Sequence, residues 1–312
     1  MMKVVYMGTP DFAVAPLKAL INNGYSVVGV FTQPDKPVGR KAVLTPPPVK
    51  VTASEENIPV FQPDTLKNGE GLKLLKQLNP DIVVVVAYGK ILPVDFLVYP
   101  KYGCINIHGS LLPKYRGAAP IQWSVINGDE YTGVTSMKMD AGLDTGDMII
   151  SEKIKIGENE TSGELYERMS ALGSEVLIKT LKQIEDGTAV FTKQADSEST
   201  YASMLDKSLS PVDFSRDAFS VHKKICGLDP WPVAQTELEG KKLKLFSSSV
   251  CEETEKSVPG SAFVTKQGLK IVCGDNRAVL IKEVQFEGKK RMNATDFFRG
   301  HSIKDGTVLG NS

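Results

Sequence analysis

Residues 81–87 read Asp-Ile-Val-Val-Val-Val-Ala, and this stretch decides the fold class. Four consecutive valines are typical of a strand that is buried on both faces, which is the environment of a parallel sheet covered by helices. Upstream, residues 3–7 and 26–32 have the composition of strands, and a helical pattern over 12–23 separates them. Strands that alternate with helices in this way form right-handed β-α-β units. The first half of the chain is therefore predicted to be an α/β domain with a Rossmann-like, mainly parallel sheet.

The character of the sequence changes after Gly187. Before it, strands are predicted at 104–107 and 135–139, and the capping-box spacing of Thr161 and Glu164 predicts a helix that runs toward Gly187. A polar, serine-rich stretch follows. A helix is then predicted at 217–226, with short strands between Gly or Pro turns at 242–247, 262–265, 269–273 and 278–286. We predict an α/β domain over 1–188, a linker over 189–209 and a smaller, OB-like β-barrel domain over 210–312.

Composition and length exclude several classes of protein. The 312 residues carry 37 Lys and Arg against 37 Asp and Glu, and 41% are hydrophobic, as in ordinary globular proteins. The longest apolar run, Ile82 to Tyr88, is far shorter than the ~20 residues of a membrane-spanning helix, and the first residues lack the pattern of a signal peptide. The four cysteines have no C-x-x-C spacing and the three histidines lie far apart in the sequence. We expect a monomeric protein of the reducing cytoplasm, with no membrane segment and no metal.

Basic residues gather in the C-terminal part. The chain after Ser208 carries 16 Lys and Arg against 13 Asp and Glu, whereas the rest carries 21 against 24. The positive residues form clusters at Lys241, Lys242 and Lys244, at Lys289, Lys290 and Arg291, and at Arg299 and Lys304. A solvated surface and a footprint for a polyanion both account for such clusters, so charge alone leaves both interpretations open.

The turn at residues 8–11, Gly-Thr-Pro-Asp, stands where a dinucleotide-binding protein has its glycine fingerprint. That fingerprint needs three glycines, whereas this turn has one glycine and a proline. This difference speaks against a nicotinamide-dependent oxidoreductase. A doubly wound sheet still binds ligands at the carboxyl ends of its strands, so the turn is compatible with a cleft for another ligand.

The richest segment is residues 104–117, Cys-Ile-Asn-Ile-His-Gly-Ser-Leu-Leu-Pro-Lys-Tyr-Arg-Gly. Asn106 and His108 alternate along a predicted strand, so both side chains project from one face. An amide beside an imidazole can bind a carbonyl group and move a proton, and a carboxylate from the acidic loop 139–147 can pair with His108 and fix its tautomer. A strand histidine is more often a satisfied core residue, and an Asp-Gly-rich loop is more often a plain turn. The pattern alone therefore leaves a structural and a catalytic interpretation open.

Two strings in this region, INIHGSLLPKYRGAAP at 105–120 and MDAGLDTGD at 139–147, resemble the signature of the folate-dependent formyltransferases. Further similar strings follow in the order of that family, namely GTPDFA at 8–13, TQPDKPVGR at 32–40 with PPPVK at 46–50, and DPWPVA at 229–234. The resemblance covers most of the chain. The loop at 34–50 and the C-terminal domain make it closest to those members that formylate a charged tRNA.

The resemblance implies formyl transfer from 10-formyltetrahydrofolate to the α-amine of methionine on the initiator tRNA, for translation initiation. It makes Asn106, His108 and Asp144 the catalytic residues, and the chemistry suits them. The amine attacks the formyl carbon, an oxyanion forms, and a proton must reach the departing folate nitrogen. Asn106 can donate a hydrogen bond to the oxyanion, worth about 3 kcal/mol when the donor is preorganised. His108 can share that task and shuttle the proton, while Asp144 stabilises the charged imidazole and organises a water.

The resemblance also implies where the formyl donor binds. The turn formed by Ser110, Leu111, Leu112 and Pro113 is expected to contact the folate, and the pterin ring is expected between the segment 86–92 and the loop 139–144. Within these two segments, the expected binding residues are Tyr88, Gly89, Ile91, Leu92 and Asp140.

The proline-rich stretch between Thr32 and Lys50 looks like the loop that enters the acceptor stem of tRNA in this family. A loop of this length is usually functional or disordered. Its cations suit phosphates, and we expect Arg40 and Lys41 to contact the tRNA. The methionyl side chain is expected at Phe12, for which a buried aromatic at a helix start is the alternative. The basic C-terminal domain is expected to bind tRNA through a barrel surface.

Several related activities stay open at this point. The same chemistry can act on the amine of a nucleotide sugar or of glycinamide ribonucleotide, although the enzyme for the second lacks a β-rich second domain. A hydrolase of formyltetrahydrofolate uses the same three residues with water. A non-catalytic nucleic-acid-binding protein would explain the basic clusters but would leave Asn106, His108 and Asp144 without a role.

Overall fold

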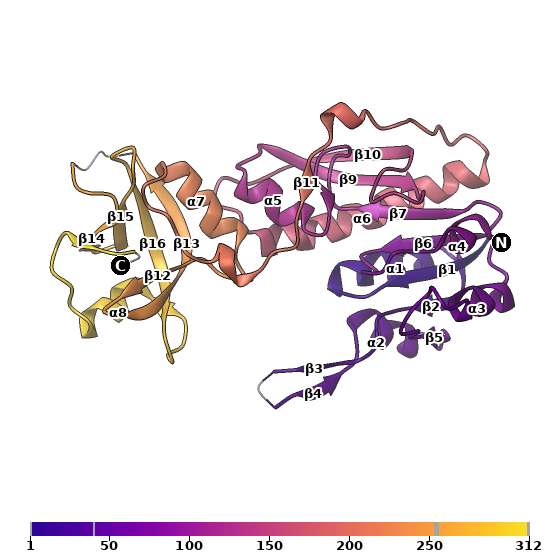
Figure 1. Cartoon of the computed structure of the whole chain (residues 1–312), viewed down its shortest axis with the longest axis horizontal. Coiled ribbons are helices and arrows are strands. Elements are labelled where there is room, and N and C mark those ends of the chain that lie inside the picture. Colours follow the sequence, from indigo (N-terminus) through magenta and orange to yellow (C-terminus); the bar gives the residue numbers. More distant parts are fainter. Residues whose placement is uncertain (1, 40, 253–255, 311–312) are drawn as a thin grey trace. The chain divides into compact units, whose positions relative to one another are not determined.

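A computed structural model of the chain, which describes residues 2–39, 41–252 and 256–310, divides it into two compact units (Figure 1). Unit 1 comprises residues 1–117, 133–154 and 166–201. Unit 2 comprises residues 118–132, 155–165 and 202–312. Unit 2 therefore takes two short stretches from the first 165 residues in addition to the C-terminal part. The division into 1–188, 189–209 and 210–312 stays a prediction.

Unit 1 is built on a seven-stranded sheet with the strand order β10-β9-β7-β6-β1-β2-β5. The strands are β1 (Lys3–Gly8), β2 (Ser26–Phe31), β5 (Val60–Phe61), β6 (Ile82–Val86), β7 (Cys104–His108), β9 (Tyr131–Lys138) and β10 (Met148–Lys155). The five strands from β5 to β7 pair in parallel, and β9 is antiparallel to β7. The predicted Rossmann-like, mainly parallel sheet is confirmed. The strands β5 and β10 are additions that no sequence pattern indicated.

The order of the strands reverses between β1 and β6. From β1 the chain moves outward through β2 to β5, and it then returns to the other side of β1 and adds β6 and β7. Open α/β sheets bind ligands at such a switch point, beyond the carboxyl ends of the strands. Gly8 ends β1 here, and a Cβ atom at this position would lie 2.7 Å from the Cβ of Ala13 and 3.0 Å from the carbonyl oxygen of Val86. The ends of β1 and β6 therefore approach closely because residue 8 has no side chain.

The predicted helices of unit 1 are present with small differences at their ends. The helix expected at 12–23 begins with a 3₁₀ turn, η1 (Asp11–Ala13), and continues as α1 (Val14–Asn22). Helix α6 (Ser162–Glu185) begins with the predicted capping box, because Glu164 accepts from the Thr161 N–H at 2.9 Å and donates its own N–H to Thr161 Oγ1 at 3.2 Å. The helices α2 (Pro48–Glu55), α3 (Glu70–Leu78) and α4 (Val94–Val98) complete the unit. None of the helices in the described part of the chain is long and apolar enough to cross a membrane.

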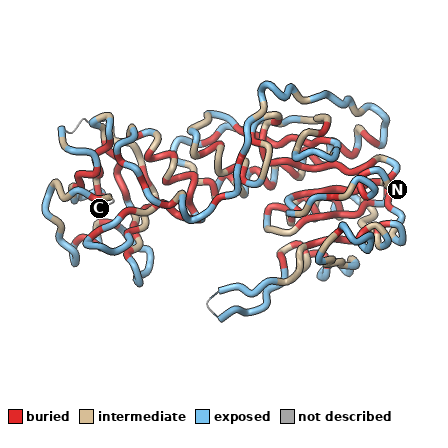
Figure 2. Tube along the Cα trace, in the orientation of Figure 1, coloured by how far each residue is buried: buried red, intermediate tan, exposed pale blue. Residues whose placement is uncertain are grey.

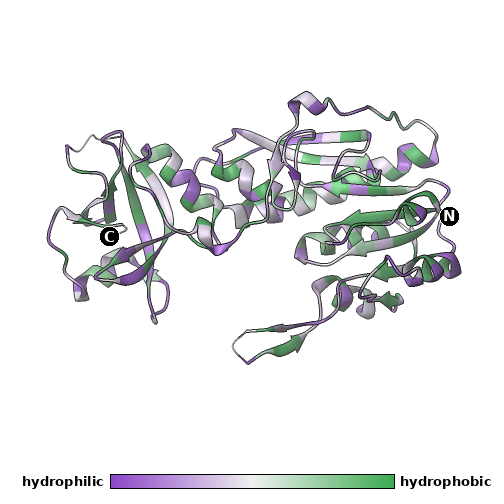
Figure 3. Cartoon of the chain, in the orientation of Figure 1, coloured by the Kyte–Doolittle hydropathy of each residue, from purple (hydrophilic) through white to green (hydrophobic). Residues whose placement is uncertain are grey.

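The stretch 34–50, which the sequence suggested as a long loop, is largely regular. It forms a hairpin of β3 (Lys36–Val38) and β4 (Val43–Thr45), and α2 begins directly after it at Pro48. Proline suits the first turn of a helix because the N–H that it lacks has no partner there. All residues of both strands are exposed, as the colour of the tube shows in Figure 2. The apolar residues Val38, Val43 and Leu44 are among them, and Figure 3 shows hydrophobic stretches in this hairpin.

The central strands of unit 1 carry its core. Every residue of β6 and of β7 is buried, as Figure 2 shows along both strands. One cluster of buried residues joins β1, β2, β6 and β7 to α3, α4 and the segment that follows β6, and its largest members include Phe31, Tyr88 and Phe96. The valine run therefore forms a strand that is buried on both faces, as predicted, and its hydrophobic character is visible in Figure 3.

Unit 2 contains a second sheet, in which β12, β13, β16, β15, β14 and β18 follow one another and β17 pairs with β16. The strands are β12 (Gln235–Leu238), β13 (Lys241–Cys251), β14 (Ser261–Thr265), β15 (Gly268–Val272), β16 (Ala278–Phe286), β17 (Met292–Asn293) and β18 (Thr307–Val308). The pairings between these strands are antiparallel. The sheet is a half-barrel, in agreement with the predicted β-barrel class of the second domain. The helices are α5 (Pro120–Ile126), α7 (Ala218–Gly227) and α8 (Ala294–Gly300).

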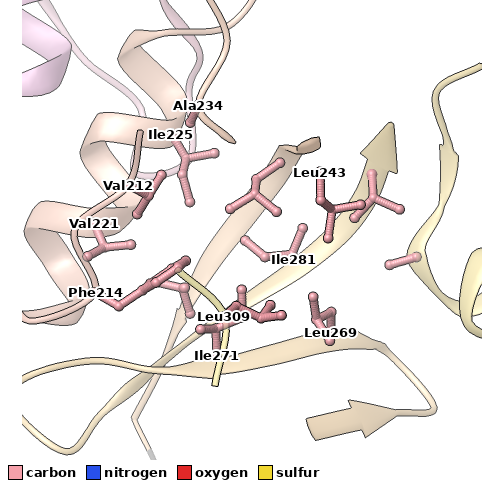
Figure 4. Packing of buried hydrophobic residues seen from close by; sticks show 14 of the residues in the cluster. Val212, Phe214, Val221, Ile225, Ala234, Leu243, Leu269, Ile271, Ile281 and Leu309 are labelled. Carbon is pink, nitrogen blue, oxygen red and sulfur yellow. The ribbon is translucent and has the colours of Figure 1, made fainter. Parts of the chain in front are cut away.

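The core of unit 2 lies between α7 and the inner face of its sheet. Val221 and Ile225 of α7 face Leu243, Ile271 and Ile281 of the strands, as the close view in Figure 4 shows. The short elements β8 (Arg116–Gly117), η2 (Asp196–Glu198), β11 (Tyr201–Ala202) and η3 (Lys207–Leu209) complete the chain.

Candidate active site

Asn106 and His108 lie at the carboxyl end of β7, next to the switch point of the unit 1 sheet. Their side chains are almost fully buried, with exposed fractions of 8% and 6%. On the neighbouring strand β9 they pair with Met137 and Thr135. Because the two residues are separated by one position in a strand, they project from the same face, as the sequence predicts.

His108 has a different partner on each ring nitrogen. Its Nε2 lies 2.9 Å from the carbonyl oxygen of Tyr115, which can only accept, so Nε2 carries a hydrogen and donates it. Its Nδ1 faces the carboxylate of Asp144, with 3.7 Å between Nδ1 and Oδ2. The same Oδ2 accepts a hydrogen bond from the N–H of Gly117 at 2.8 Å. The structure therefore brings His108 and Asp144 together, and Nδ1 is the ring nitrogen left to exchange a proton.

Asp144 is held by a loop, residues 139–147, which joins β9 to β10. The loop is closed at its base, where Lys138 N–H donates to the carbonyl oxygen of Asp147 at 2.9 Å. Asp144 itself has a φ of +53°, in the left-handed region that non-glycine residues rarely adopt. A Cβ atom on Gly146 would overlap the carbonyl oxygen of Lys138, so the loop needs a glycine at this position. Backbone conformations of this kind persist only where the surroundings fix them.

Asp140 shapes the same loop. Its Oδ1 accepts from the N–H of Gly142 at 3.0 Å and from the hydroxyl of Thr145 at 2.7 Å. Asp140 is exposed, as are the three residues that follow it. Its role in holding the formyl donor stays a prediction.

The turn from Ser110 to Pro113 is fixed from within. Ser110 is fully buried and its hydroxyl donates to the carbonyl oxygen of Lys114 at 2.6 Å. The hydroxyl of Thr135 donates to the carbonyl oxygen of Ser110 at 2.8 Å, and the same hydroxyl oxygen accepts from the N–H of Leu112 at 3.2 Å. Leu111 and Pro113 are half-buried, whereas Leu112 is buried. The turn therefore offers a rigid edge at the end of β7.

The segment that follows β6 is tied to the ends of the neighbouring strands. The carbonyl oxygen of Tyr88 accepts from Thr9 Oγ1 at 3.0 Å and from Gln33 Nε2 at 3.1 Å. Tyr88 is 1% exposed, and burial raises the pKa of its phenol to about 12, so the hydroxyl is neutral. Among the described residues, its hydroxyl oxygen is one of three buried side-chain atoms without a hydrogen-bond partner.

The other predicted residues of this segment differ in exposure. Leu92 is buried at 4%, whereas Ile91 is 74% exposed and Gly89 is exposed with a φ of +83°. Lys90 between them donates to the carbonyl oxygens of Pro63 and Asp64 at 2.6 and 2.8 Å. The segment therefore combines a buried apolar side with an exposed apolar side chain.

A cavity of about 390 Å³ lies between the end of α4 and the start of the loop 139–147. Its walls include Val94, Leu97, Met139 and Asp140, and the cations Lys101 and Lys138 line it as well. The volume is in the range of small-molecule sites. Of the predicted donor-binding residues, Asp140 lines this cavity, but none of the three predicted catalytic residues lines it.

Phe12 is 4% exposed and packs against Tyr166, with 5.2 Å between the ring centroids. Its N–H donates to the Tyr166 hydroxyl at 3.1 Å, and its carbonyl oxygen accepts from Ser170 Oγ at 2.9 Å. These contacts fit the alternative of a buried aromatic at a helix start. Contact with a methionyl side chain stays a prediction.

The cations of the hairpin region fall into two groups. Lys41 is exposed, and Arg40 lies outside the described residues. Lys50 is engaged, because its Nζ lies 2.8 Å from both carboxylate oxygens of Asp35 and 2.8 Å from Gln62 Oε1. Lys50 therefore anchors the start of α2 rather than standing free for a phosphate.

Two residues that hold the site were missed by sequence reasoning. Gln194, inside the predicted linker, donates to the carbonyl oxygens of Asp144 and Gly146 at 2.8 Å each, and Arg116 donates to Gln194 Oε1 at 3.0 Å. Contacts to main-chain carbonyls leave no spacing pattern in a sequence, so only the string that contains Arg116 gave a signal. In the described part of the chain, no three His, Cys, Asp or Glu side chains form a group that can hold a metal ion.

Two families of protein sequences match the chain. The family described as "Formyl transferase" matches residues 2–181, and the one described as "Formyl transferase, C-terminal domain" matches residues 204–302. Among curated proteins, the methionyl-tRNA formyltransferase of Alkaliphilus oremlandii is 48% identical over 99% of this chain and 100% of its own length. The methionyl-tRNA formyltransferase of Acetivibrio thermocellus is 47% identical with the same coverage.

Solved structures share the fold at lower identity. An N-formyltransferase from Helicobacter canadensis, solved with folinic acid and dTDP-3-aminofucose, has a TM-score of 0.70 at 22% identity and covers 90% of this chain and 99% of its own. HypX from Aquifex aeolicus, solved with tetrahydrofolic acid, has a TM-score of 0.64 at 15% identity, covering 97% of this chain and 48% of its own. At these identities the likeness concerns the fold alone.

Proposed function

Because this chain belongs to the formyl transferase family, we propose that it transfers a formyl group from 10-formyltetrahydrofolate to the α-amine of methionyl initiator tRNA, for translation initiation. The observation that carries the proposal is the pairing of His108 and Asp144 beside Asn106 at the carboxyl end of β7. The full-length likeness to proteins named for this activity supports the choice of acceptor.

The first step of the proposed reaction is attack of the neutral amine on the formyl carbon. A bond forms between the amine nitrogen and this carbon, and the carbonyl oxygen takes up the electron pair. The buried amide of Asn106 donates a hydrogen bond to that oxygen. A donor held by a buried strand costs no reorganisation when the charge develops, which is why such donors lower the barrier.

The second step breaks the bond between the formyl carbon and the folate nitrogen. The amine loses one proton and the departing nitrogen gains one, so a group that moves a proton is required. His108 serves through Nδ1, because Nε2 already donates to the carbonyl oxygen of Tyr115. Asp144 opposite Nδ1 stabilises the imidazolium that forms while the proton is in transit.

The donor 10-formyltetrahydrofolate supplies an activated formyl group, and the site has features that fit it. Neutral Tyr88 and the half-buried turn at 110–113 border the switch point, and the exposed side chains of Ile91 and Leu143 add apolar surface. We propose that Tyr88, Gly89, Ile91, Leu92, Asp140 and the Ser110–Pro113 turn hold the donor.

The acceptor is a polyanion, and the surface of the chain offers cations in both units. In unit 1, Lys36 and Lys41 lie exposed on the hairpin. In unit 2, Lys241 and Lys242 lie exposed at the start of β13. We propose that the hairpin and the basic clusters of unit 2 contact the tRNA, with Arg40 and Phe12 as further contacts. The protein acts as a monomer in the cytoplasm in this proposal.

One assay tests the proposed function against its rivals. The chain is incubated with 10-formyltetrahydrofolate and one of three acceptors, which are methionyl initiator tRNA, an amino-sugar nucleotide and water alone. Formyl-methionine on the tRNA is the expected product. Formylation of the sugar amine without the tRNA product, or release of formate at the same rate with all three, overturns the proposal.

A further inference from the structure

Residues 192–200, which precede β11 and lie in the predicted linker, cross the loop that carries Asp144. We call them the crossing segment. Its start pairs with β10, where Thr192 and Met148 exchange two main-chain hydrogen bonds of 2.8 Å. Gln194 then contacts the Asp144 loop, and Asp196 binds Arg116 with 2.7 Å between Oδ1 and Nη2. A segment that only connects two domains needs none of these contacts.

The other end of the crossing segment contacts the chain beside His108. Thr200 accepts twice, with its hydroxyl from the N–H of Tyr115 at 2.8 Å and with its carbonyl oxygen from the N–H of Arg116 at 2.9 Å. Tyr115 provides the carbonyl oxygen that binds His108 Nε2, and it has a φ of +61°. One segment therefore contacts the partner of His108 and the loop of Asp144.

The amide of Gln194 can be oriented in only one way. Its Nε2 has two hydrogens and lies 2.8 Å from two carbonyl oxygens, those of Asp144 and Gly146, which only accept. Its Oε1 lies 3.0 Å from the Nε of Arg116, which only donates. Each hydrogen of Nε2 and the oxygen Oε1 therefore has a partner. The two carbonyl groups belong to Asp144, which has the left-handed backbone conformation, and to Gly146, two residues further along the loop.

We propose that Gln194 is a positioning residue that fixes the Asp144 loop so that the Asp144 carboxylate stays opposite His108 Nδ1. Asp144 sits in an unfavourable backbone conformation in a loop whose neighbours 140–143 are exposed. Its 3.7 Å separation from Nδ1 depends on that conformation. The kinetic part of this inference rests on the proposed function, whereas its structural part does not.

The variant Gln194→Glu separates the role of the amide oxygen Oε1 from the role of the amide nitrogen Nε2. A glutamate keeps an oxygen for Arg116 but presents a carboxylate oxygen to two carbonyl oxygens, so it holds the crossing segment and releases the loop. We expect kcat for formyl transfer to fall about 10- to 100-fold in Gln194→Glu and in Gln194→Ala, because a misplacement near 1 Å costs about 100-fold. The KM for methionyl-tRNA stays unchanged. A wild-type kcat in Gln194→Glu overturns the proposal.

A double-mutant cycle tests whether Gln194 acts through Asp144. In an Asp144→Ala background, Gln194→Glu has nothing left to position, so the double variant has a kcat within about twofold of Asp144→Ala alone. If the two losses multiply, Gln194 acts elsewhere and the proposal is wrong. Two controls accompany the cycle. Ser199→Ala removes a crossing-segment hydrogen bond to Asp196 O, and Asn23→Asp turns a donor to the carbonyl oxygen of Ala19 into a carboxylate; both keep the wild-type kcat.

Hydrogen exchange tests the structural part of the inference, and it does so independently of which acceptor the enzyme formylates. Gly117 donates its N–H to Asp144 Oδ2, so this amide exchanges faster when the loop is released. We expect faster exchange in peptides covering 139–147 and Gly117 in Gln194→Glu and Gln194→Ala, and unchanged exchange in both controls. Unchanged exchange in both Gln194 variants overturns the inference, even where the wild-type chain formylates methionyl-tRNA. Faster exchange supports it, even where that activity is missing.

Discussion

The carboxyl end of β7 in unit 1 and the 289–291 cluster in unit 2 hold their polar side chains in opposite ways. Asn106 and His108 are buried, and their positions come from a strand that is itself buried along its whole length. Lys289 and Lys290 are exposed on the turn after β16. Buried polar groups are preorganised for short-range chemistry, whereas exposed cations act on a polyanion over a longer range and are screened by salt.

Arg291 belongs to neither kind, although it follows the two lysines directly. Its guanidinium lies 2.6 Å from Glu283 and 3.7 Å from Asp229, and it stacks over the ring of Phe246 at 4.1 Å. The hydrogen bonds from Ser247 and Arg291 lower the pKa of the Glu283 carboxyl. Arg291 is therefore part of the structure of unit 2, whereas the structure gives no ion pair for Lys289 and Lys290 among the described residues.

The largest expected effect comes from removing the polar side chains at the carboxyl end of β7. His108→Ala and Asn106→Ala each lower kcat about 100-fold or more, because each removes an interaction made chiefly in the transition state. Affinity for the folate donor changes little. Steady-state kinetics with methionyl-tRNA, together with a binding titration of the donor, measures both quantities. A near-normal turnover of His108→Ala contradicts the mechanism.

A comparison of two Asp144 variants sharpens the role of its charge. Asp144→Asn keeps an oxygen that accepts from the N–H of Gly117 but removes the negative charge opposite His108 Nδ1. Asp144→Ala removes both. We expect kcat to fall about 100-fold in either variant, because a carboxylate that stabilises imidazolium has no neutral substitute.

Hydrogen exchange at 139–147 distinguishes the two Asp144 variants. We expect the wild-type exchange rate in Asp144→Asn and a faster rate in Asp144→Ala. If Asp144→Asn has the wild-type kcat, the oxygen matters only as an acceptor for the loop.

The third prediction separates Arg291 from Lys289 and Lys290. Arg291→Ala lowers the free energy of unfolding by about 1–2 kcal/mol, since it removes a partly exposed ion pair and the stacking of the guanidinium on Phe246. Replacing Lys289 and Lys290 together by Ala leaves thermal stability unchanged. This double variant weakens tRNA binding and makes it less dependent on salt, by about 0.7–0.9 in the logarithmic slope for each phosphate that the protein no longer neutralises.

Thermal unfolding and tRNA affinity against potassium concentration measure these effects. An unchanged affinity and slope in the lysine variant would remove this turn from the tRNA site. A stable Arg291→Ala variant with a salt defect would contradict the structural role of Arg291.

Sequence patterns located those features of the molecule whose geometry one element sets by itself. The alternation of Asn106 and His108 along a strand, and the capping box of Thr161 and Glu164, depend on residues two or three positions apart. Gln194 lies 50 residues from Asp144 in the sequence, and it contacts only main-chain oxygen atoms there. No residue type or spacing marks such a contact.

The same limit explains the differences in the surface charges and in the loop at 34–50. Lys50 and Arg291 look like free cations in the sequence, because their acidic partners Asp35 and Glu283 come from other elements. The hairpin of β3 and β4 escaped notice because its strands are three residues long and contain proline and exposed apolar residues instead of an alternating pattern. Short strands of this kind carry too few residues for a period to be seen.

The smallest expected effect concerns the start of α6, which the sequence located correctly. Hydrogen bonds from the N–H and hydroxyl of Thr161 lower the pKa of the Glu164 carboxyl below its ordinary value of 4.5. An acid whose pKa is lower in the folded state stabilises the fold above its unfolded pKa, and this contribution is lost as the pH falls through the folded value. Glu164→Ala therefore lowers the free energy of unfolding by about 1 kcal/mol at pH 7, and its difference from wild type shrinks below pH 4.5. Glu164→Gln keeps an acceptor without a titrating group, so the stability that it retains does not follow this titration. Thermal unfolding of the three proteins between about pH 3 and pH 7 measures the effect, and a constant difference between wild type and Glu164→Ala over this range would show that the ionised carboxylate contributes nothing to the cap.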